Sequence, residues 1–208
     1  MNAPATFQAP PTDTRARLLE AAKTLMRTKG YHATSVDELC GAAGVTKGAF
    51  FHHFPTKEAL GVAAADYWSS ITGAMFATAP YHDHDDPLDR IMAYLDFRLT
   101  LLNGPIEAAT CYAGTVVQET FHTSEAIRAA CKASIWDHAA RLESDIAEAM
   151  AAHGVTGTSA HSLALHTQAV VQGAFIMAKA ADDMNVAVDS VTHLKTYFNH
   201  VFHHPREN

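Results

Sequence analysis

Residues 34–60 constrain the fold more than any other stretch, because they predict two short helices joined by a tight turn. Thr34 can cap the first helix, with Asp37 as its partner in a capping box. Gly44 can adopt the positive φ that ends this helix, and Thr46 can cap the second. The apolar residues of the first helix share one face at helical spacing: Val36, Leu39, Cys40 and Ala43. This pattern fits any helical hairpin, and it also fits the helix-turn-helix unit that enters the major groove of DNA.

The rest of the chain predicts an all-α protein of about nine helices. An amphipathic helix is expected over 13–29 and a long fourth helix from about 56 to 79, followed by a polar break over 81–87. Further helices are expected over 88–102, 124–153, 160–181 and 188–203, and one or two short helices over 106–121. We predict a disordered arm over 1–12, a three-helix helix-turn-helix domain over 13–58 and a helical domain over 59–208.

Charge is distributed unevenly along the chain. The net charge of −7 argues at first against a nucleic-acid partner. Residues 13–58, however, hold seven basic and five acidic residues, whereas the remaining residues hold eight basic and seventeen acidic ones. This asymmetry is typical of a small DNA-facing head on an acidic body, although an excess of two positive charges is modest.

The string Ala-Gly-Val-Thr-Lys-Gly-Ala-Phe-Phe-His-His-Phe-Pro-Thr-Lys-Glu-Ala-Leu, which ends at Leu60, resembles the recognition segment of the TetR family of bacterial transcriptional regulators. The resemblance extends over about residues 13–62. It implies a homodimer that binds palindromic double-stranded operator DNA and releases it when a small-molecule effector binds the body. The residues expected at the DNA are Ser35, Thr46, Lys47, Gly48, Ala49, Phe51, His52, His53 and Lys57.

Two positions depart from the family pattern. Phe51 stands where tyrosine is more usual, so a phenolic phosphate contact is missing and His52 could replace part of it. Asp37 stands where some relatives carry a polar or basic residue that reads bases, and its carboxylate disfavours a phosphate contact. For His53, packing between helix ends is as good an interpretation as a phosphate contact.

The resemblance also implies a dimer surface on the last two helices and an effector pocket in the body. The expected dimer residues are Leu165, Ala169, Gly173, Met177, Leu194, Tyr197, Phe198 and Val201. The expected pocket residues are Trp68, Phe97, Cys111, Tyr112, Thr115, Gln118, Trp136, Phe175 and Met177. Each set has an alternative, which is ordinary packing within one chain, because apolar residues at helical spacing are usually core. Residues 110–119 and 126–131 look like one C-terminal subgroup of the family.

Other functions receive less support from the sequence. Cys40, Cys111 and Cys131 are an odd number without paired spacing, which favours a reduced, cytoplasmic protein, and leaves a cysteine-based redox sensor as an alternative. The histidines and aspartates of 82–86 could hold a metal, but no second cluster joins them, so we expect no metal and no cofactor. No phosphate loop, nucleophile elbow or catalytic histidine pair indicates an enzyme. No membrane span and no signal peptide are expected. A helical interaction protein that has lost DNA binding stays open.

Overall fold

The computed structural model describes residues 13–203 and, within them, is built of α-helices joined by turns and one short 3-10 helix, with no strands. The predicted arm over 1–12 lies outside the described residues. The helices are α1 Thr14–Lys29, α2 Val36–Ala43, α3 Lys47–His53, α4 Lys57–Ala77, η1 Pro80–Asp83, α5 Pro87–Thr100, α6 Ile106–Ala109, α7 Tyr112–Thr120, α8 Glu125–His153, α9 Ala160–Ala181 and α10 Asn185–His203. The all-α prediction is confirmed. The described part has ten α-helices, because residues 106–121, for which one or two short helices were expected, form two.

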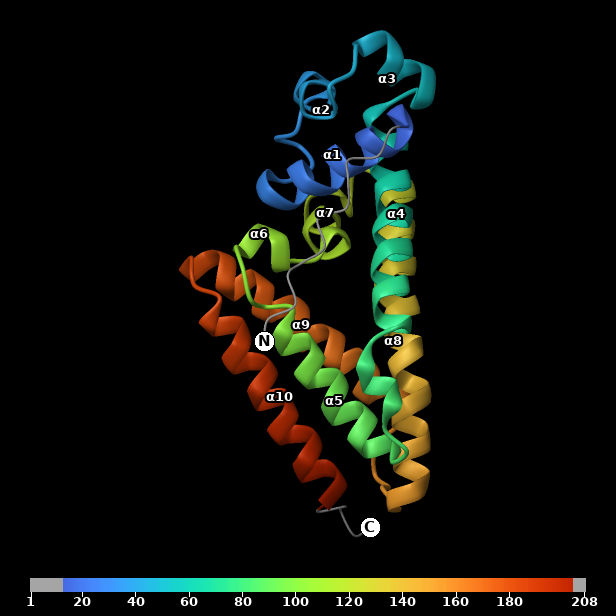
Figure 1. Ribbon diagram of the computed structural model, residues 1–208, viewed down its shortest axis with the longest axis vertical. Coiled ribbons are helices and arrows are strands. Elements are labelled where there is room, and N and C mark those ends of the chain that lie inside the picture. The colour runs from blue at the N-terminus through green and yellow to red at the C-terminus, as the bar shows by residue number, and fades with distance from the viewer. Residues whose placement is uncertain (1–12, 204–208) are drawn as a thin grey trace.

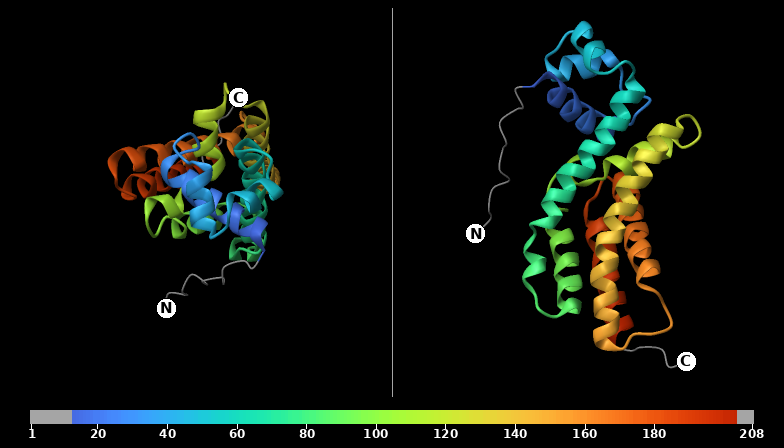
Figure 2. Two further views of the ribbon diagram at one scale, coloured as in Figure 1. Left: turned by 90° about the horizontal axis from the view of Figure 1, so that it is seen from above. Right: turned by 90° about the vertical axis from the view of Figure 1, so that its right-hand side faces the viewer.

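The molecule is elongated, with α1, α2 and α3 gathered at one end as a head and the longer helices forming a body (Figure 1). Helix α4 leaves the head and runs into the body beside α8, as the side view shows (Figure 2). It starts at Lys57 and continues without a break across the boundary predicted between residues 58 and 59. Head and body are therefore joined by a continuous helix.

The turn between α1 and α2 differs from the prediction at one cap. Ser35, not Thr34, caps α2: its hydroxyl accepts from the Glu38 amide at 3.2 Å, and the Glu38 carboxylate accepts from the Ser35 amide at 2.8 Å. The Thr34 side chain is fully buried and donates to the Gly30 carbonyl at 2.7 Å, so it is not available as a cap. The assignment of Thr34 with Asp37 was therefore wrong by one residue. The predicted left-handed Gly44 and the Thr46 cap are confirmed.

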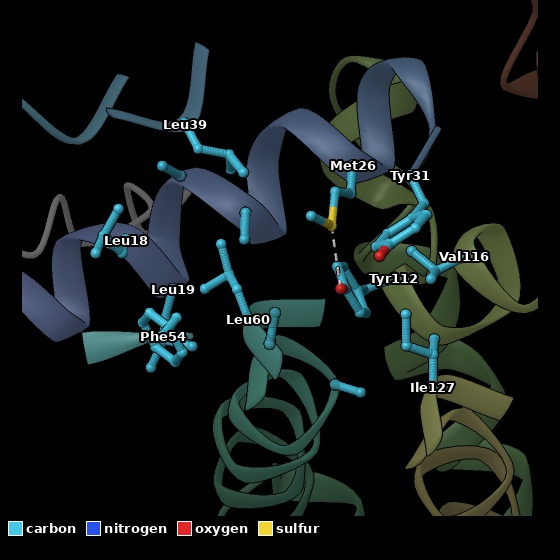
Figure 3. Packing of buried hydrophobic residues seen from close by; sticks show 14 of the residues in the cluster. Leu18, Leu19, Met26, Tyr31, Leu39, Phe54, Leu60, Tyr112, Val116 and Ile127 are labelled. Carbon is cyan, nitrogen blue, oxygen red and sulfur yellow. Dashed lines mark hydrogen bonds between the residues drawn. The ribbon is translucent and has the colours of Figure 1, made fainter. Parts of the chain in front are cut away.

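The hydrophobic core of the head is shared with the body (Figure 3). Leu18, Leu39 and Leu60 from the head and the start of α4 belong to the same buried cluster as Tyr112 of α7 and Ile127 of α8. Tyr112 is at its centre: its hydroxyl lies 3.1 Å from the Gly61 carbonyl oxygen and 3.3 Å from the sulfur of Met26. Because α1, α4, α7 and α8 bury these side chains together, the head has no separate core of its own.

The body has two further clusters. One fills the space between α5, α8, α9 and α10 with residues that include Tyr94, Ile146 and Phe198. The other lies where α9 and α10 meet the end of α5, around Leu102 and Val191. The Cys111 sulfur caps α7 by accepting from the Gly114 amide at 3.4 Å. Residues 110 and 111 are not helical and separate α6 from α7.

Gly30 ends α1 at φ 91°, a conformation that side chains disfavour. The Glu119 carboxylate of α7 lies directly against it and accepts from the His32 amide at 2.8 Å, so a methyl group at Gly30 would overlap this carboxylate. We therefore expect Gly30→Ala to lower the free energy of unfolding by about 1–3 kcal/mol, as measured by chemical denaturation.

The matched control is Gly41→Ala, which lies within α2 and has open space around its Cβ. This change should raise stability slightly, because alanine favours the helix by about 0.5–1 kcal/mol. Equal effects of the two substitutions would contradict the role given to the contact between Gly30 and Glu119.

Candidate nucleic-acid interface and ligand cavity

Helix α3 is held by two buried aromatic side chains and presents its other face to solvent. Phe50 is fully buried and Phe54 nearly so, and their ring centroids lie 6.2 Å apart. On the outer face Phe51 keeps 53% of its surface exposed, next to exposed His52. Lys47 and Gly48 are exposed at the start of the helix. The remaining predicted DNA residues are exposed or half-buried in the same region: Ser35, Thr46, Ala49, His53 and Lys57.

Lys47 is paired with an acid in the head. Its ammonium lies 2.7 Å from a carboxylate oxygen of Asp37, and both side chains are largely exposed. Hydrogen bonding to Asp37 raises the pKa of Lys47. The sequence indicated that Asp37 opposes a phosphate contact, but it did not indicate that this acid neutralises the base at the start of α3.

Lys57, predicted as a phosphate contact, has partners inside the head. Its ammonium donates to the Tyr31 carbonyl at 3.1 Å and to the Thr34 carbonyl at 3.0 Å, and lies 4.3 Å from the centre of the Tyr31 ring. Burial lowers its pKa. In this structure Lys57 therefore holds the turn that precedes α2 against the start of α4.

A cavity of about 340 Å³ lies in the body between α4, α5, α8 and α9. Of the nine predicted pocket residues, Trp68, Cys111 and Phe175 line it. A second cavity of about 240 Å³ lies between α7 and α9 and is lined by Thr115 and Gln118 together with Cys111 and Phe175. The predicted set is therefore divided between two neighbouring cavities.

The other four predicted pocket residues do not line either cavity, which corrects the prediction. Tyr112 is fully buried in the core shared by head and body, and Phe97 packs edge-on against Phe76 at 5.3 Å. Trp136 and Met177 are 45% and 59% exposed on the outer surface. Helical spacing could not separate these positions, because a core, a cavity wall and a surface patch can share the same apolar period.

Six polar residues of the larger cavity were not predicted as pocket residues: Thr72, Arg98, Ser134, His138, Gln168 and Gln172. The Arg98 guanidinium donates to the Tyr94 hydroxyl at 2.8 Å and lies 2.6 Å from Nε2 of His138. Because arginine only donates, Nε2 of His138 is the acceptor. Burial, followed by the charges of Arg98 and Arg141, lowers the pKa of His138 to about 2, so this imidazole is neutral.

The wall of this cavity also contacts the head. Arg27 of α1 is buried, and its guanidinium lies 4.7 Å from the centre of the Trp68 ring while donating to the Ala108 carbonyl. Trp68 and Ala108 both line the cavity. Burial lowers the pKa of Arg27. Lys179 of α9 donates to the Arg27 carbonyl at 3.1 Å, so the end of α1 is tied to three elements of the body.

The predicted dimer residues fall into three groups by exposure. Ala169, Met177 and Tyr197 are exposed, and Leu165, Gly173 and Val201 are half-buried. A Cβ added at Gly173 would meet nothing within 4 Å. Leu194 and Phe198 are instead buried in the chain's own core. Ile176, which was not predicted, is 47% exposed beside Met177.

The cysteines do not form disulfides: Cys40 and Cys131 are buried and Cys111 is half-buried. Burial raises the pKa of Cys131 to about 12, which suppresses the reactive thiolate. The described residues contain no group of three or more histidine, cysteine or acidic side chains placed to hold a metal ion. Between residues 13 and 203 no helix is long and apolar enough to cross a membrane.

These features define a helix-turn-helix protein whose head is attached to a larger helical body. Two family models match the chain: "Bacterial regulatory proteins, tetR family" over residues 18–64, and "Transcriptional regulator LmrA/YxaF-like, C-terminal domain" over residues 87–187. The chain belongs to the TetR family and is a transcriptional regulator with a DNA-binding helix-turn-helix domain.

Individual relatives agree with this assignment. The uncharacterized HTH-type transcriptional regulator YxaF of Bacillus subtilis is 27% identical over 120 residues, which cover 57% of this chain and 62% of YxaF. The HTH-type transcriptional regulator LmrA of the same organism is 24% identical over 170 residues, covering 81% of this chain and 88% of LmrA.

Solved structures show the same fold. A TetR-family regulator from Agrobacterium tumefaciens superposes with a TM-score of 0.78 at 20% identity, covering 88% of this chain and 96% of that protein. A TetR regulator from Chloroflexus aurantiacus superposes with a TM-score of 0.77 at 26% identity, covering 89% of this chain and 94% of that protein.

Proposed function

We propose that this protein is a homodimeric repressor that binds palindromic operator DNA through α3 and releases it when a small molecule fills the larger body cavity. The observation that carries the proposal is the presentation of α3. Phe50 anchors the helix, while small and basic residues at its exposed start leave room for a close approach of DNA. The acidic body, by contrast, does not attract phosphate.

The expected contacts divide by chemistry. Lys47 reaches a base edge or a phosphate from the start of α3, with Gly48 and Ala49 allowing the approach. The Thr46 and Ser35 hydroxyls face phosphates beside the helix starts that they cap. Phe51, His52 and His53 complete the surface, and Lys57 supports it from within through its bonds to the Tyr31 and Thr34 carbonyls. Phe51 contributes an apolar face that suits a thymine methyl group rather than a phosphate.

Breaking the ion pair between Lys47 and Asp37 should change DNA affinity in a predictable direction. Asp37→Asn removes the carboxylate that competes with DNA for Lys47, so we expect tighter binding. Lys47→Ala should weaken binding about tenfold and reduce the dependence of log affinity on log salt by about one unit. The measurement is fluorescence anisotropy with DNA flanking the protein's own gene, at several salt concentrations.

Lys132→Ala on the exposed face of α8 is the matched control and should bind DNA as the unmodified protein does. If the unmodified protein bound no fragment even at low salt, the repressor proposal would fail and the alternative of a helical interaction protein would replace it. Weaker binding by Asp37→Asn would contradict the competition between carboxylate and DNA.

Dimerisation is proposed because one short helix offers few contacts, whereas two related heads can read both halves of a palindrome. One face of α9 supports a dimer surface on the last two helices. Ala169, Gly173 and Met177 recur at intervals of four, so they lie on one face of the helix, and Tyr197 of α10 is exposed as well. The absence of a side chain at Gly173 allows two helices to approach closely.

Gly173→Arg should separate the two subunits, because it places a bulky charge at the proposed contact. We expect the dimer dissociation constant to rise by at least about thirtyfold, measured by sedimentation equilibrium. The monomer should stay folded, since the site is open and arginine favours helices more than glycine does. Ala133→Arg, on an exposed face of α8, is the control. A dimer that survives Gly173→Arg unchanged would place the interface elsewhere.

Ligand response is proposed because the cavity wall is also the attachment of the head. A ligand shifts the head only if it binds one arrangement more tightly than another, so cavity and head must share contacts. Arg27 provides them, through the Trp68 ring and the Ala108 carbonyl. Helix α4 provides a second connection, since it starts at Lys57 beside the head and lines the cavity with Trp68, Met75 and other residues.

A side chain that fills the cavity should act as a substitute for a ligand. Ser134 lines the cavity from α8, and Ser134→Phe is expected to weaken operator binding about tenfold, within the usual range of allosteric coupling of about 5- to 150-fold. Adding Arg27→Met should restore part of the affinity, because it removes one of the two connections between cavity and head. Anisotropy with the same DNA measures both effects.

Ala133→Phe is the matched control, because the neighbouring residue faces solvent on the same helix. Melting curves of each variant exclude unfolding as the cause of lost binding. Equal operator affinities for Ser134→Phe and Ala133→Phe would argue against coupling between cavity and head, while leaving DNA binding itself intact.

A further inference from the structure

The larger cavity is lined mainly by apolar residues, and among the described residues the only formal charge in its wall is positive. Nineteen residues line it, and Arg98 is the one arginine or lysine among them, with no aspartate or glutamate. Most of the others are apolar, and aromatic rings come from Trp68, Phe76 and Phe175. The wall therefore combines a hydrophobic surface with one positive charge.

Arg98 has no acidic partner. Within residues 13–203, no carboxylate lies within 4.0 Å of its guanidinium. Its hydrogen bonds go to Tyr94 and His138, which are both uncharged, and its charge lies 4.5 Å from the centre of the Phe76 ring. By contrast, Arg90 on the same helix contacts two carboxylates, those of Asp145 and Glu148. The Arg98 charge is oriented by its neighbours and remains unneutralised.

The two neutral partners fix the direction of the guanidinium. Nε donates to the Tyr94 hydroxyl and Nη2 donates to His138, whereas Nη1 makes no hydrogen bond to the described part of the chain. Because His138 stays neutral, it adds no second charge and simply accepts. A guanidinium held in this way is preorganised for an anion, since the direction of its free donor is set before any ligand arrives.

Gln168 supplies an independent sign of a missing ligand. It lies on α9, is only 5% exposed and lines the cavity. Its side-chain nitrogen is buried and has no hydrogen-bond partner in the described structure. A buried donor without an acceptor destabilises the empty protein, so such groups are rare unless something else satisfies them. Within a cavity wall, that acceptor is most simply an atom of the ligand.

We propose that the cavity binds a compact organic anion, with its carboxylate or equivalent acidic group paired to Arg98 and an acceptor atom hydrogen-bonded to the Gln168 amide. The rest of the ligand is an apolar body of one or two rings, because about 340 Å³ is at the lower end of the range for small-molecule sites. This inference rests on the proposed function, since it names the chemical class of the effector.

The experiment compares acids with their uncharged amides. Isothermal titration calorimetry on the full-length protein is carried out with three pairs: naphthalene-2-carboxylate, 4-phenylbutanoate and octanoate, each against its carboxamide. We expect at least one acid to bind at least about tenfold more tightly than its amide. Arg98→Met should remove this preference, and Arg98→Lys should keep part of it by retaining the charge.

Two controls separate ligand binding from folding. Arg141→Met removes another arginine of the body that does not line the cavity, and should leave the preference for the acid unchanged. Gln168→Leu should weaken binding of the preferred acid but raise the melting temperature of the empty protein, because it removes a buried donor without a partner. A merely structural role for Gln168 would instead lower the melting temperature.

The outcomes distinguish this inference from the proposed function. If no acid binds more tightly than its amide, or if Arg98→Met retains the preference, the organic-anion proposal is overturned even when DNA binding is intact. If an acid binds through Arg98 but leaves operator affinity unchanged, the ligand class stands and the release of DNA by ligand fails. Release of operator DNA by the acid and not by its amide would support both.

Discussion

Burial of Tyr112 between α1 and α4 is the contact on which the arrangement of this protein depends. The side chain comes from α7 in the body, yet its hydroxyl meets the Gly61 carbonyl and the Met26 sulfur at the base of the head. Since the surrounding leucines and Ile127 belong to the same cluster, separating head from body would expose a hydrophobic core. The position of the head therefore depends on how α4, α7 and α8 pack beneath it.

The cavity is next to this shared core, so its wall and the base of the head have residues in common. Trp68 is half-buried against the shared core and also lines the cavity, and Arg27 covers its ring from α1. These few residues lie between two regions of different chemistry, the exposed face of α3 and the body cavity. One is an exposed helix start whose lysine is paired with Asp37, and the other is a largely apolar cavity with a single oriented cation.

The sequence predicted the helices well because each has a clear apolar period, and helix starts carry side chains that can cap them. The error at Thr34 arose because two adjacent residues can both cap, and only burial of the Thr34 hydroxyl decides between them. The cavity was harder to predict. Arg98 and Gln168 do share the inward face of their helices, at three residues from Leu95 and from Val171, so a polar residue within an apolar stripe was an available signal. The ion pair between Lys47 and Asp37 depends on the angle at which α2 and α3 meet. Residue spacing in the sequence does not predict that angle.

The contact between Arg27 and Trp68 also has a consequence for chimeras, in which the head of one relative is joined to the body of another. It crosses the boundary at which a head would be exchanged between relatives, with the arginine on one side and the ring on the other. A chimera joined at residue 58 would keep this contact only if the incoming head placed a long cation at the same turn of its first helix. The head and the cavity wall are therefore not independent modules, because the contact between Arg27 and Trp68 belongs to both.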